Sequence, residues 1–428
     1  MSIAASLEVI NSTGTSIFVA EIDQVNDDST WNAPASGTTI PDGSSISFGM
    51  GNSSFIPLGC GCNFQFVNAQ GQAGNIYMDV PAFGSNTVTG ASPQNAFLYT
   101  IDNPNGNSYV VTITAPADFD DMIVLPELSL TRTAMAANNG NIYIAWIGVS
   151  DNKINLMCST DNGQTFSNLY TSEETSWHAP ALCSNNGFFT IAWTGMDGHI
   201  NLATIEMSGE YMNGNQITGF TGKIRTKHTS PYGPALASWG DYGIYLAWTG
   251  DDNHVILAHY ADPATQTSRY ESGETSSQAP ALGMNNVNFF IAWKGDGNDN
   301  LNVATGDPNP ISGEVKFGDP VILPETSPIN PALAYDWSSS RMYLAWKGDG
   351  NDNLNLMYAS FSAPDGVSPS WSGFGNKLIS AITSGYAPTL CDTAVNWYAG
   401  MPKSKVLISW PHETPLMQNY INVGTVRS

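Results

Sequence analysis

The chain has 428 residues, of which 42% are hydrophobic and 12% are charged, and its 41 Gly and 25 Pro favour many short strands and tight turns over amphipathic helices. This length exceeds that of one ordinary domain and predicts two or three, each large enough to bury its own core. The net charge of −23 repels phosphate backbones and anionic headgroups at long range, which argues against nucleic acid as a partner.

The first residues, MSIAASLEVINSTG, have no basic n-region and no sustained apolar h-region, and nowhere do 18 apolar residues run together. We therefore expect a soluble protein made without a classical signal peptide, which is cytoplasmic or is released by lysis or injection. The cysteines are few, and Cys60 and Cys62 are too close in sequence for an ordinary disulfide framework. We expect them to be mostly buried thiols.

Residues 1–118 alternate strand-like runs with Gly, Ser and Asn turns. The runs are SLEVINS, TSIFVAEI, TTIP, SSISFGM, NFQFVNA, NIYMDV, NAFLYTI and SYVVTIT. Such spacing predicts a β-sandwich of seven or eight strands. The stretch ADFDD, from Ala117 to Asp121, is the expected linker.

Three features of this region resemble the aegerolysin family: the opening LEVINSTGTSIFV, the turn from Pro41 to Gly43, and IYMDVPAFGSNTVTG. The resemblance implies a small β-sandwich that binds membrane lipid and assists a pore-forming partner protein. It places Tyr77, Asp79, Pro81, Asn86 and Thr87 at the motif positions, and we take Tyr77, Asp79 and Trp31 as lipid-binding candidates. Met78 and Val80 stand where the family motif has Trp and Cys, so a sandwich that spaces or oligomerises the second domain is the alternative.

A repeat occupies residues 119–428. A Trp ends a short apolar run in NIYIAW, FFTIAW, GIYLAW, NFFIAW, RMYLAW and KVLISW, at Trp146, Trp193, Trp248, Trp293, Trp346 and Trp410. Upstream lies a second landmark, PALC, PALA, PALG, PALA or PTLC, which TAMA replaces in the first unit. This spacing predicts four-stranded blades, with strand A at the second landmark, strand B at the Trp, then strands C and D. We expect the tryptophans to pack between adjacent sheets; the alternative is that they line pockets at the blade junctions.

The ends of the repeat predict how the ring closes. The segment IVLPELSLTRTA, near Ile123, matches VILPETSPINPA from the middle of the array, yet no A, B or C strand precedes it. The last unit ends after its C strand, QNYINVGTV. The chain is therefore predicted to be all-β, with an N-terminal β-sandwich followed by a six-bladed β-propeller that is closed by an N-terminal outer strand.

The connections from strand D to the next strand A emerge on one face, together with the turns from B to C. Each connection carries a Ser four residues before the second landmark and then variable side chains. Aromatic rings stack on the apolar faces of sugars while short polar groups bond to hydroxyls, so glycan binding is predicted for this face. The candidates are Trp177, His178, Tyr232, Gln278, Asn330, Tyr386, Asp296, Asn298, Asp349 and Asn351. The alternative is that the Ser and Pro only shape the crossover between blades.

The turns GDGNDN at 295–300 and 348–353 have a second interpretation. Acidic and amide side chains in loops can hold calcium, for which the candidates are Asp296, Asp299, Asp349 and Asp352. The alternative is that they only serve hairpin turns that tolerate positive φ. No other cofactor is expected.

The string STDNGQTF, from Ser159 to Phe166, matches the Asp box of sialidases, where it is a structural turn between strands C and D. The Trp repeats also resemble those of bacterial and fungal proteins labelled sialidase-like, which implies a six-bladed propeller. Catalysis of that type needs an arginine cluster, and Arg225, Arg269, Arg341 and Arg427 fall away from the candidate face, which leaves Arg132 alone. Glu127, Glu174, Glu274 and Glu325 recur in successive blades, which favours a repeated structural or binding role over a unique catalytic one.

The sequence thus predicts a non-enzymatic, lectin-like protein that binds cell-surface glycans multivalently, with a sandwich that contacts lipid or a partner, as a toxin or defence factor. A glycoside hydrolase or sialidase relative is the first alternative, and it would need a pair of catalytic carboxylates. A protein-interaction propeller without sugar affinity is the second.

Overall fold

A computed structural model of the chain describes residues 3–426, except 14–15, 27–29, 54–58, 69–72, 93–96, 115–118, 139, 186, 209–215, 239–242, 286, 309–313, 351, 363–369, 372, 394–403 and 414–418. Throughout these residues the regular structure consists of strands and no helix, which confirms the predicted all-β class. Among the same residues there is no helix long and apolar enough to cross a membrane. The chain divides into two compact units, Met1–Ala117 and Asp118–Ser428.

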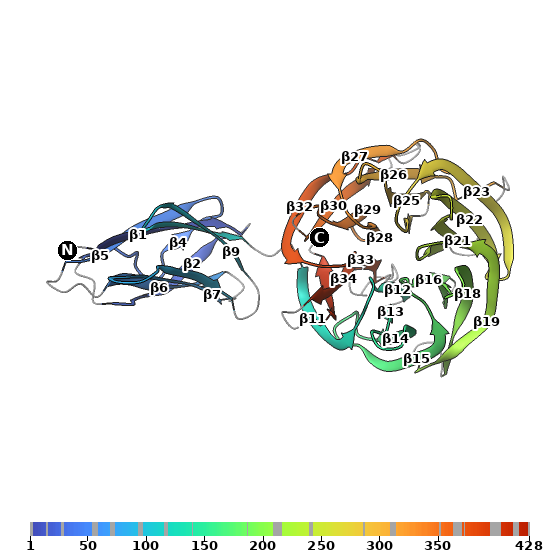
Figure 1. The fold of residues 1–428 in the computed structure, drawn as a ribbon, viewed down its shortest axis with the longest axis horizontal. Coiled ribbons are helices and arrows are strands. Elements are labelled where there is room, and N and C mark those ends of the chain that lie inside the picture. The colour runs from blue at the N-terminus through green and yellow to red at the C-terminus, as the bar shows by residue number, and fades with distance from the viewer. Residues whose placement is uncertain are drawn as a thin grey trace. The chain divides into compact units, whose positions relative to one another are not determined.

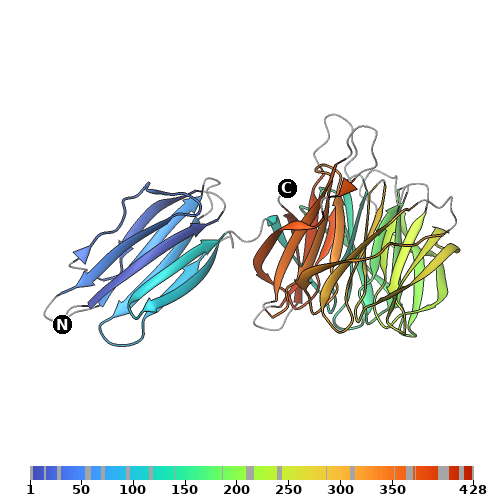
Figure 2. The same ribbon diagram turned by 90° about the horizontal axis from the view of Figure 1, so that it is seen from above.

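The N-terminal unit consists of two five-stranded sheets (Figure 2). The first has the order β3 (Thr30–Trp31), β5 (Ser45–Asn52), β1 (Ile3–Ser12), β10 (Ser108–Thr114), β9 (Leu98–Asn105), and the second β4 (Thr39–Ile40), β2 (Ile17–Gln24), β6 (Gly59–Asn68), β7 (Ala73–Pro81), β8 (Thr87–Ala91). β1 and β10 pair in parallel, and the other pairs are antiparallel.

Buried and exposed side chains alternate along the strands of this unit, so that each sheet has a core face and an outer face. In β7, for example, Ile76, Met78 and Val80 are buried and the residues between them are partly exposed. Because side chains of a strand point alternately to opposite faces, one face of each sheet contributes to a single shared core that includes Leu7, Phe48, Phe64 and Phe66. The strand-like runs of the sequence did not include two of these strands, β3 and β8.

The C-terminal unit consists of six sheets placed around a ring (Figure 1). We number them as blades 1 to 6 and give the strands from the centre outwards. Blade 1 is β12 (Ala134–Asn138), β13 (Asn141–Ile147), β14 (Lys153–Ser159), β15 (Ser167–Thr175); blade 2 is β16 (Ala181–Asn185), β17 (Phe188–Thr194), β18 (His199–Ser208), β19 (Gln216–Thr229); blade 3 is β20 (Ala235–Ser238), β21 (Ile244–Thr249), β22 (His254–Asp262), β23 (Thr265–Thr275).

The other three blades repeat this order. Blade 4 is β24 (Ala281–Met284), β25 (Phe289–Lys294), β26 (Asn300–Gly306), β27 (Val321–Thr326); blade 5 is β28 (Ala332–Asp336), β29 (Arg341–Lys347), β30 (Asn353–Ser362), with β31 (Ser370–Trp371) and β32 (Gly375–Thr383) both paired to β30; blade 6 is β33 (Thr389–Asp392), β34 (Val406–Glu413), β35 (Asn419–Val426), β11 (Phe119–Leu128). Each innermost strand contacts those of both neighbouring blades, so the ring is continuous.

The ring closes through β11, which comes from the start of the unit and pairs antiparallel with β35 from its end. The prediction that the segment near Ile123 is the outer strand of the last blade is confirmed. The linker prediction is wrong for Phe119, Asp120 and Asp121, because these residues already belong to β11. Phe119 is buried, and its ring lies 5.6 Å from that of Trp410.

The strand-B tryptophans lie at the junctions between blades, as predicted. All six are at most 2% exposed. Trp193 packs with blade 1, Trp248 with blade 2, and Trp346 with blade 4, so each indole fills the space between its own sheet and the preceding one. All five cysteines are likewise buried and free, as expected.

The turn at Ser159–Phe166 joins β14 to β15 and is held by its own side chains. The Asp161 carboxylate accepts hydrogen bonds from the Thr165 amide at 2.9 Å and the Thr165 hydroxyl at 2.6 Å, and Ser159 Oγ accepts one from the Gly163 amide at 2.9 Å. Burial raises the pKa of Asp161, but the bonds from Thr165 and Ser159 outweigh it, and the net pKa is below the ordinary value. The residues of this turn therefore have a structural role.

We predict that Phe119→Ala lowers the free energy of unfolding of the C-terminal unit by about 3 kcal/mol, because it leaves a cavity against Trp410 at the closing sheet. The matched control is Val124→Thr on the same strand, a residue that is 65% exposed, which should change the value by less than about 0.5 kcal/mol. Urea unfolding followed by tryptophan fluorescence measures both, since every Trp except Trp31 belongs to this unit. Equal effects of the two substitutions would contradict closure through β11.

We predict that Asp161→Asn lowers stability by about 1 kcal/mol at pH 7, because a charged hydrogen-bond acceptor is replaced by a neutral one at a partly exposed site. A carboxyl whose pKa is lowered by folding stabilises the protein above its unfolded-state pKa, and this contribution is lost as the pH falls through the folded-state pKa. The gap between wild type and variant should therefore close in acid. Urea midpoints measured from pH 7 to pH 2 test this, and a gap independent of pH would refute it.

Candidate functional site

The centre of the propeller holds a cavity of about 190 Å³ where the outer strand of each blade leads into the inner strand of the next. All six connections contribute to its lining. The residues that border it are Leu130, Thr131, Arg132, Trp177, His178, Ala179, Tyr232, Gly233, Gln278, Ala279, Ile329, Asn330, Gly385, Tyr386 and Ala387.

Each connection is shaped by the Ser that recurs four residues before the second landmark of the repeat. The hydroxyl of Ser230, for example, accepts a hydrogen bond from the Tyr232 amide at 3.1 Å, and Ser176 Oγ donates to the His178 carbonyl oxygen at 2.8 Å. Ser and Thr hydroxyls commonly stabilise turns by such bonds to nearby backbone groups. Ser176 is fully buried, so the recurrent Ser fixes the backbone and the residues after it border the cavity.

Six of the predicted glycan-binding residues border this one cavity: Trp177, His178, Tyr232, Gln278, Asn330 and Tyr386. The sequence predicted multivalent binding on this face, whereas these six residues converge on one cavity at the ring centre. Trp177 is 61% exposed, and the hydroxyl of Tyr386 accepts a hydrogen bond from Asn419 Nδ2 at 3.0 Å. Burial lowers the pKa of His178, so its imidazole is neutral near pH 7. The role of these residues in binding stays a prediction.

Three further predicted glycan-binding residues do not border the cavity. Asp296, Asn298 and Asp349 lie in the turns between strands B and C. The Asn298 side-chain oxygen accepts a hydrogen bond from the Asn300 amide at 3.2 Å, which is a turn-forming contact. Asn351 lies outside the described residues.

Two of the calcium candidates pair with lysines. Lys294 Nζ contacts the carboxylate of Asp299, and Lys347 Nζ lies 2.6 Å from that of Asp352. The Lys294 side chain is only 8% exposed, so Asp299 neutralises a cation that is largely removed from water. In the part of the chain that the structure describes, no three His, Cys, Asp or Glu side chains group as metal ligands would. Calcium binding at these turns stays a prediction.

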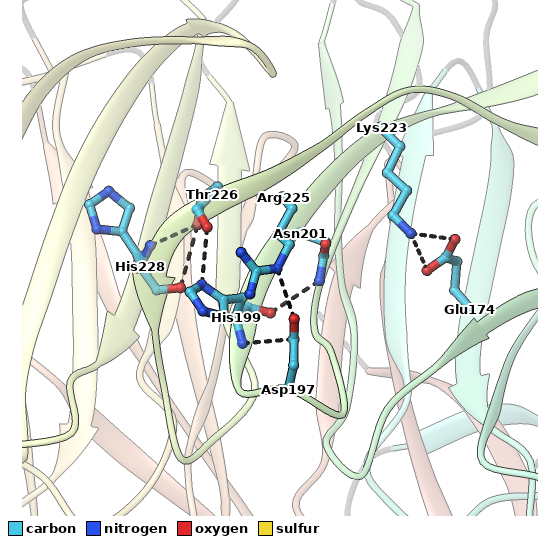
Figure 3. Close-up of polar contacts among 8 residues, drawn as sticks. All are labelled: Glu174, Asp197, His199, Asn201, Lys223, Arg225, Thr226 and His228. Atoms are coloured by element: carbon cyan, nitrogen blue, oxygen red, sulfur yellow. Dashed lines mark hydrogen bonds and ion pairs between the residues drawn. The ribbon is translucent and has the colours of Figure 1, made fainter.

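The glutamates that recur at the ends of the outer strands include two that join neighbouring blades by ion pairs. Lys223 on β19 lies 2.6 Å from the Glu174 carboxylate on β15 (Figure 3), and Lys377 on β32 contacts Glu325 on β27 in the same way. Both lysines also lie 5.6 Å from the ring centre of their own blade's Trp. These two glutamates thus have a structural role at the rim of the propeller.

Three of the arginines have partners away from the cavity. Arg225 pairs with Asp197 at 2.8 Å (Figure 3), Arg269 pairs with Glu271 at 2.6 Å, and Arg341 lies over the Tyr358 ring at 4.3 Å. Arg427 lies outside the described residues. Arg132 borders the cavity and was not among the residues predicted to bind a ligand. A departure from the repeat could have identified it. In most units a small residue precedes the Pro of the second landmark, whereas in the first unit Arg132 precedes TAMA.

A second cavity of about 70 Å³ is lined by the inner strands. Apart from Arg132, Thr133 and Thr389, its lining is apolar and consists mainly of Leu and Ala side chains, such as Leu182, Leu236 and Leu282. Arg132 also borders the first cavity. Arg132 therefore lies at the boundary between the two cavities.

The lipid-binding candidates lie within the N-terminal unit. Trp31 is half-buried against the core, with its ring 6.2 Å from that of Phe48 in an edge-to-face arrangement. Tyr77 and Asp79 lie on the outer face of β7, and Asn26 Nδ2 donates to Asp79 Oδ1 at 3.4 Å. The most exposed large apolar side chain described in this unit is Phe83, at 88%. Contact of these residues with lipid stays a prediction.

No protein-family model and no curated protein matches the sequence. Solved structures with a similar fold include the Hadza microbial sialidase Hz136, which is 11% identical, with a TM-score of 0.46 and coverage of 90% of this chain and 77% of that one. Another is the subtype N10 neuraminidase-like protein of A/little yellow-shouldered bat/Guatemala/060/2010, which is 10% identical, with a TM-score of 0.42 and coverage of 72% and 98% respectively. At this level of similarity neither structure assigns a function to this chain.

Proposed function

We propose that the propeller binds a carbohydrate in the central cavity and releases it unchanged. The observation that supports this proposal most is the convergence of Trp177, Tyr232 and Tyr386 with His178, Gln278 and Asn330 on one cavity. Small-molecule sites combine apolar and aromatic walls with a few polar groups of fixed orientation, and this lining has that composition. Aromatic rings stack on the apolar faces of a sugar, while the amides and the imidazole hydrogen-bond to its hydroxyls.

The rigidity of the lining supports binding as well. Residues that precede strand A are held by the buried Ser of each connection, and Thr194 and Thr249 donate further hydrogen bonds to the carbonyl oxygens of Tyr232 and Gln278 at 2.7 and 2.6 Å. A site whose backbone is fixed before binding loses less conformational entropy when the ligand arrives. The connections are therefore suited to hold aromatic and amide groups in place for a small ligand.

The lining favours binding over hydrolysis. Glycosidases need two carboxyl groups on either side of the scissile bond. None of the described residues that border the cavity is Asp or Glu. Glu174 and Glu325 pair with lysines at the outer strands instead. These observations support a lectin-like role over that of a glycoside hydrolase or sialidase relative.

We predict that the full-length protein gives saturable binding on a glycan array, and that Trp177→Ala or Tyr232→Ala weakens it about tenfold, which corresponds to about 1.4 kcal/mol for a lost stacking contact. The matched control is Leu169→Ala, an exposed apolar residue on the outer strand β15, which should leave binding unchanged. A panel of chromogenic glycosides run in parallel should show no turnover.

Two results would overturn the proposal. Turnover of any glycoside by wild type but not by the Trp177 variant would support a hydrolase. Failure to bind any glycan would support the alternative of a propeller that binds proteins.

A further inference from the structure

One position of the repeat differs sharply between the blades. This position is the residue directly before the second landmark of each unit (PALA, its variants, or TAMA). It is small in four connections, at Ala179, Gly233, Ala279 and Ala387, and these small residues leave space at the ring centre. The two large residues at this position are Arg132 and Asn330. They come from connections that are not adjacent in the ring, and they contact each other.

The contacts of Arg132 use only part of its hydrogen-bonding capacity. With the amide turned so that its oxygen faces the guanidinium, Asn330 accepts from Arg132 Nε at 3.3 Å and Nη1 at 2.9 Å. Arg132 Nη2 donates to the Pro234 carbonyl oxygen at 3.4 Å. A guanidinium has five N–H groups, so one N–H on each terminal nitrogen is left. Two such groups form the fork that binds a carboxylate or sulfate through two oxygens.

The charge of Arg132 has no counterion among the residues that the structure describes. None of the ion pairs found there includes it, and the cavity lining contains no Asp or Glu. Burial lowers the pKa of Arg132 to about 10, so the side chain stays protonated at neutral pH. Arg132 is partly buried, and a cation that is partly withdrawn from water without an opposite charge is costly, so an anion that enters the cavity relieves this cost.

We propose that the ligand of the central cavity carries an anionic group, a carboxylate or a sulfate ester on the sugar, which Arg132 binds while Asn330 orients the guanidinium. This inference rests on the proposed function and narrows it from sugars in general to acidic sugars. The protein as a whole repels anions, with a net charge of −23, so selection of an acidic ligand depends on this single cation at short range.

The test compares sugars that share a ring and differ at one carbon: glucose, glucuronate and glucose 6-sulfate, and the same series of galactose. Isothermal titration of the full-length protein should show that at least one acidic member binds tenfold or more tightly than its neutral parent. Arg132→Gln should abolish this preference, so that the acidic members bind no more tightly than their neutral parent does to the same variant. Arg132→Lys should retain part of the preference, since it keeps the charge and loses the fork.

Asn330→Asp provides a second test that leaves Arg132 in place. Its carboxylate would lie against the guanidinium and take the place of the ligand's anion, so the preference for acidic sugars should disappear. Asn330→Ala is the control, because it removes the orienting contact without adding charge, and should reduce the preference less than Asn330→Asp does. Urea unfolding midpoints near that of wild type establish that each variant is folded.

The outcomes separate this inference from the proposed function. If sugars bind and binding needs Trp177, but acidic and neutral members bind equally in wild type and in Arg132→Gln, the inference fails and the proposed function stands. If sodium sulfate or sodium acetate alone binds as tightly as the acidic sugars and Arg132→Gln abolishes it, the cavity is an anion site and the proposed function fails. If no sugar and no anion binds, both fail.

Discussion

Burial of one tryptophan between each pair of neighbouring sheets is the interaction on which the propeller depends. Twisted sheets that radiate from a centre diverge outwards, and a large flat side chain on the second strand fills the wedge between them. Each indole is almost completely buried and packs on the preceding blade. Because aromatic side chains bury large apolar areas, six such contacts hold the blades in one ring and keep their inner ends close together.

This packing also positions the cavity. The inner strands contact one another around the ring, and the connections that lead into them therefore end near a common point. The recurrent Ser fixes the backbone of each connection, so the next two residues are free to vary without loss of the turn. Structure and recognition are thus divided within a few residues: Ser176 maintains the fold, and Trp177 and His178 border the cavity.

Polar side chains away from the cavity mainly maintain the fold. Asp161 closes its own turn, Asn298 forms a turn through the Asn300 amide, and Glu174 bridges two outer strands through Lys223. None of the described residues that border the central cavity is Asp or Glu, although the net charge of the chain is −23. Arg132 does border it, and its charge meets only an amide oxygen and a backbone carbonyl among the contacts found.

The sequence by itself determined the all-β class, the repeat and the partner of the first propeller strand. The tryptophans from Trp146 to Trp410 and the Pro landmarks recur at a regular spacing, and the segment near Ile123 matches an outer strand that has no blade of its own before it. Spacing also selected six residues that line the cavity. Only the tertiary structure decided that these residues share one cavity, that Asp296 and Asn298 do not border it, and that Arg132 contacts Asn330. The reason is physical: a period places a residue within its blade, whereas the closure of the ring decides which blades' side chains meet at the centre and which charges there are left uncompensated.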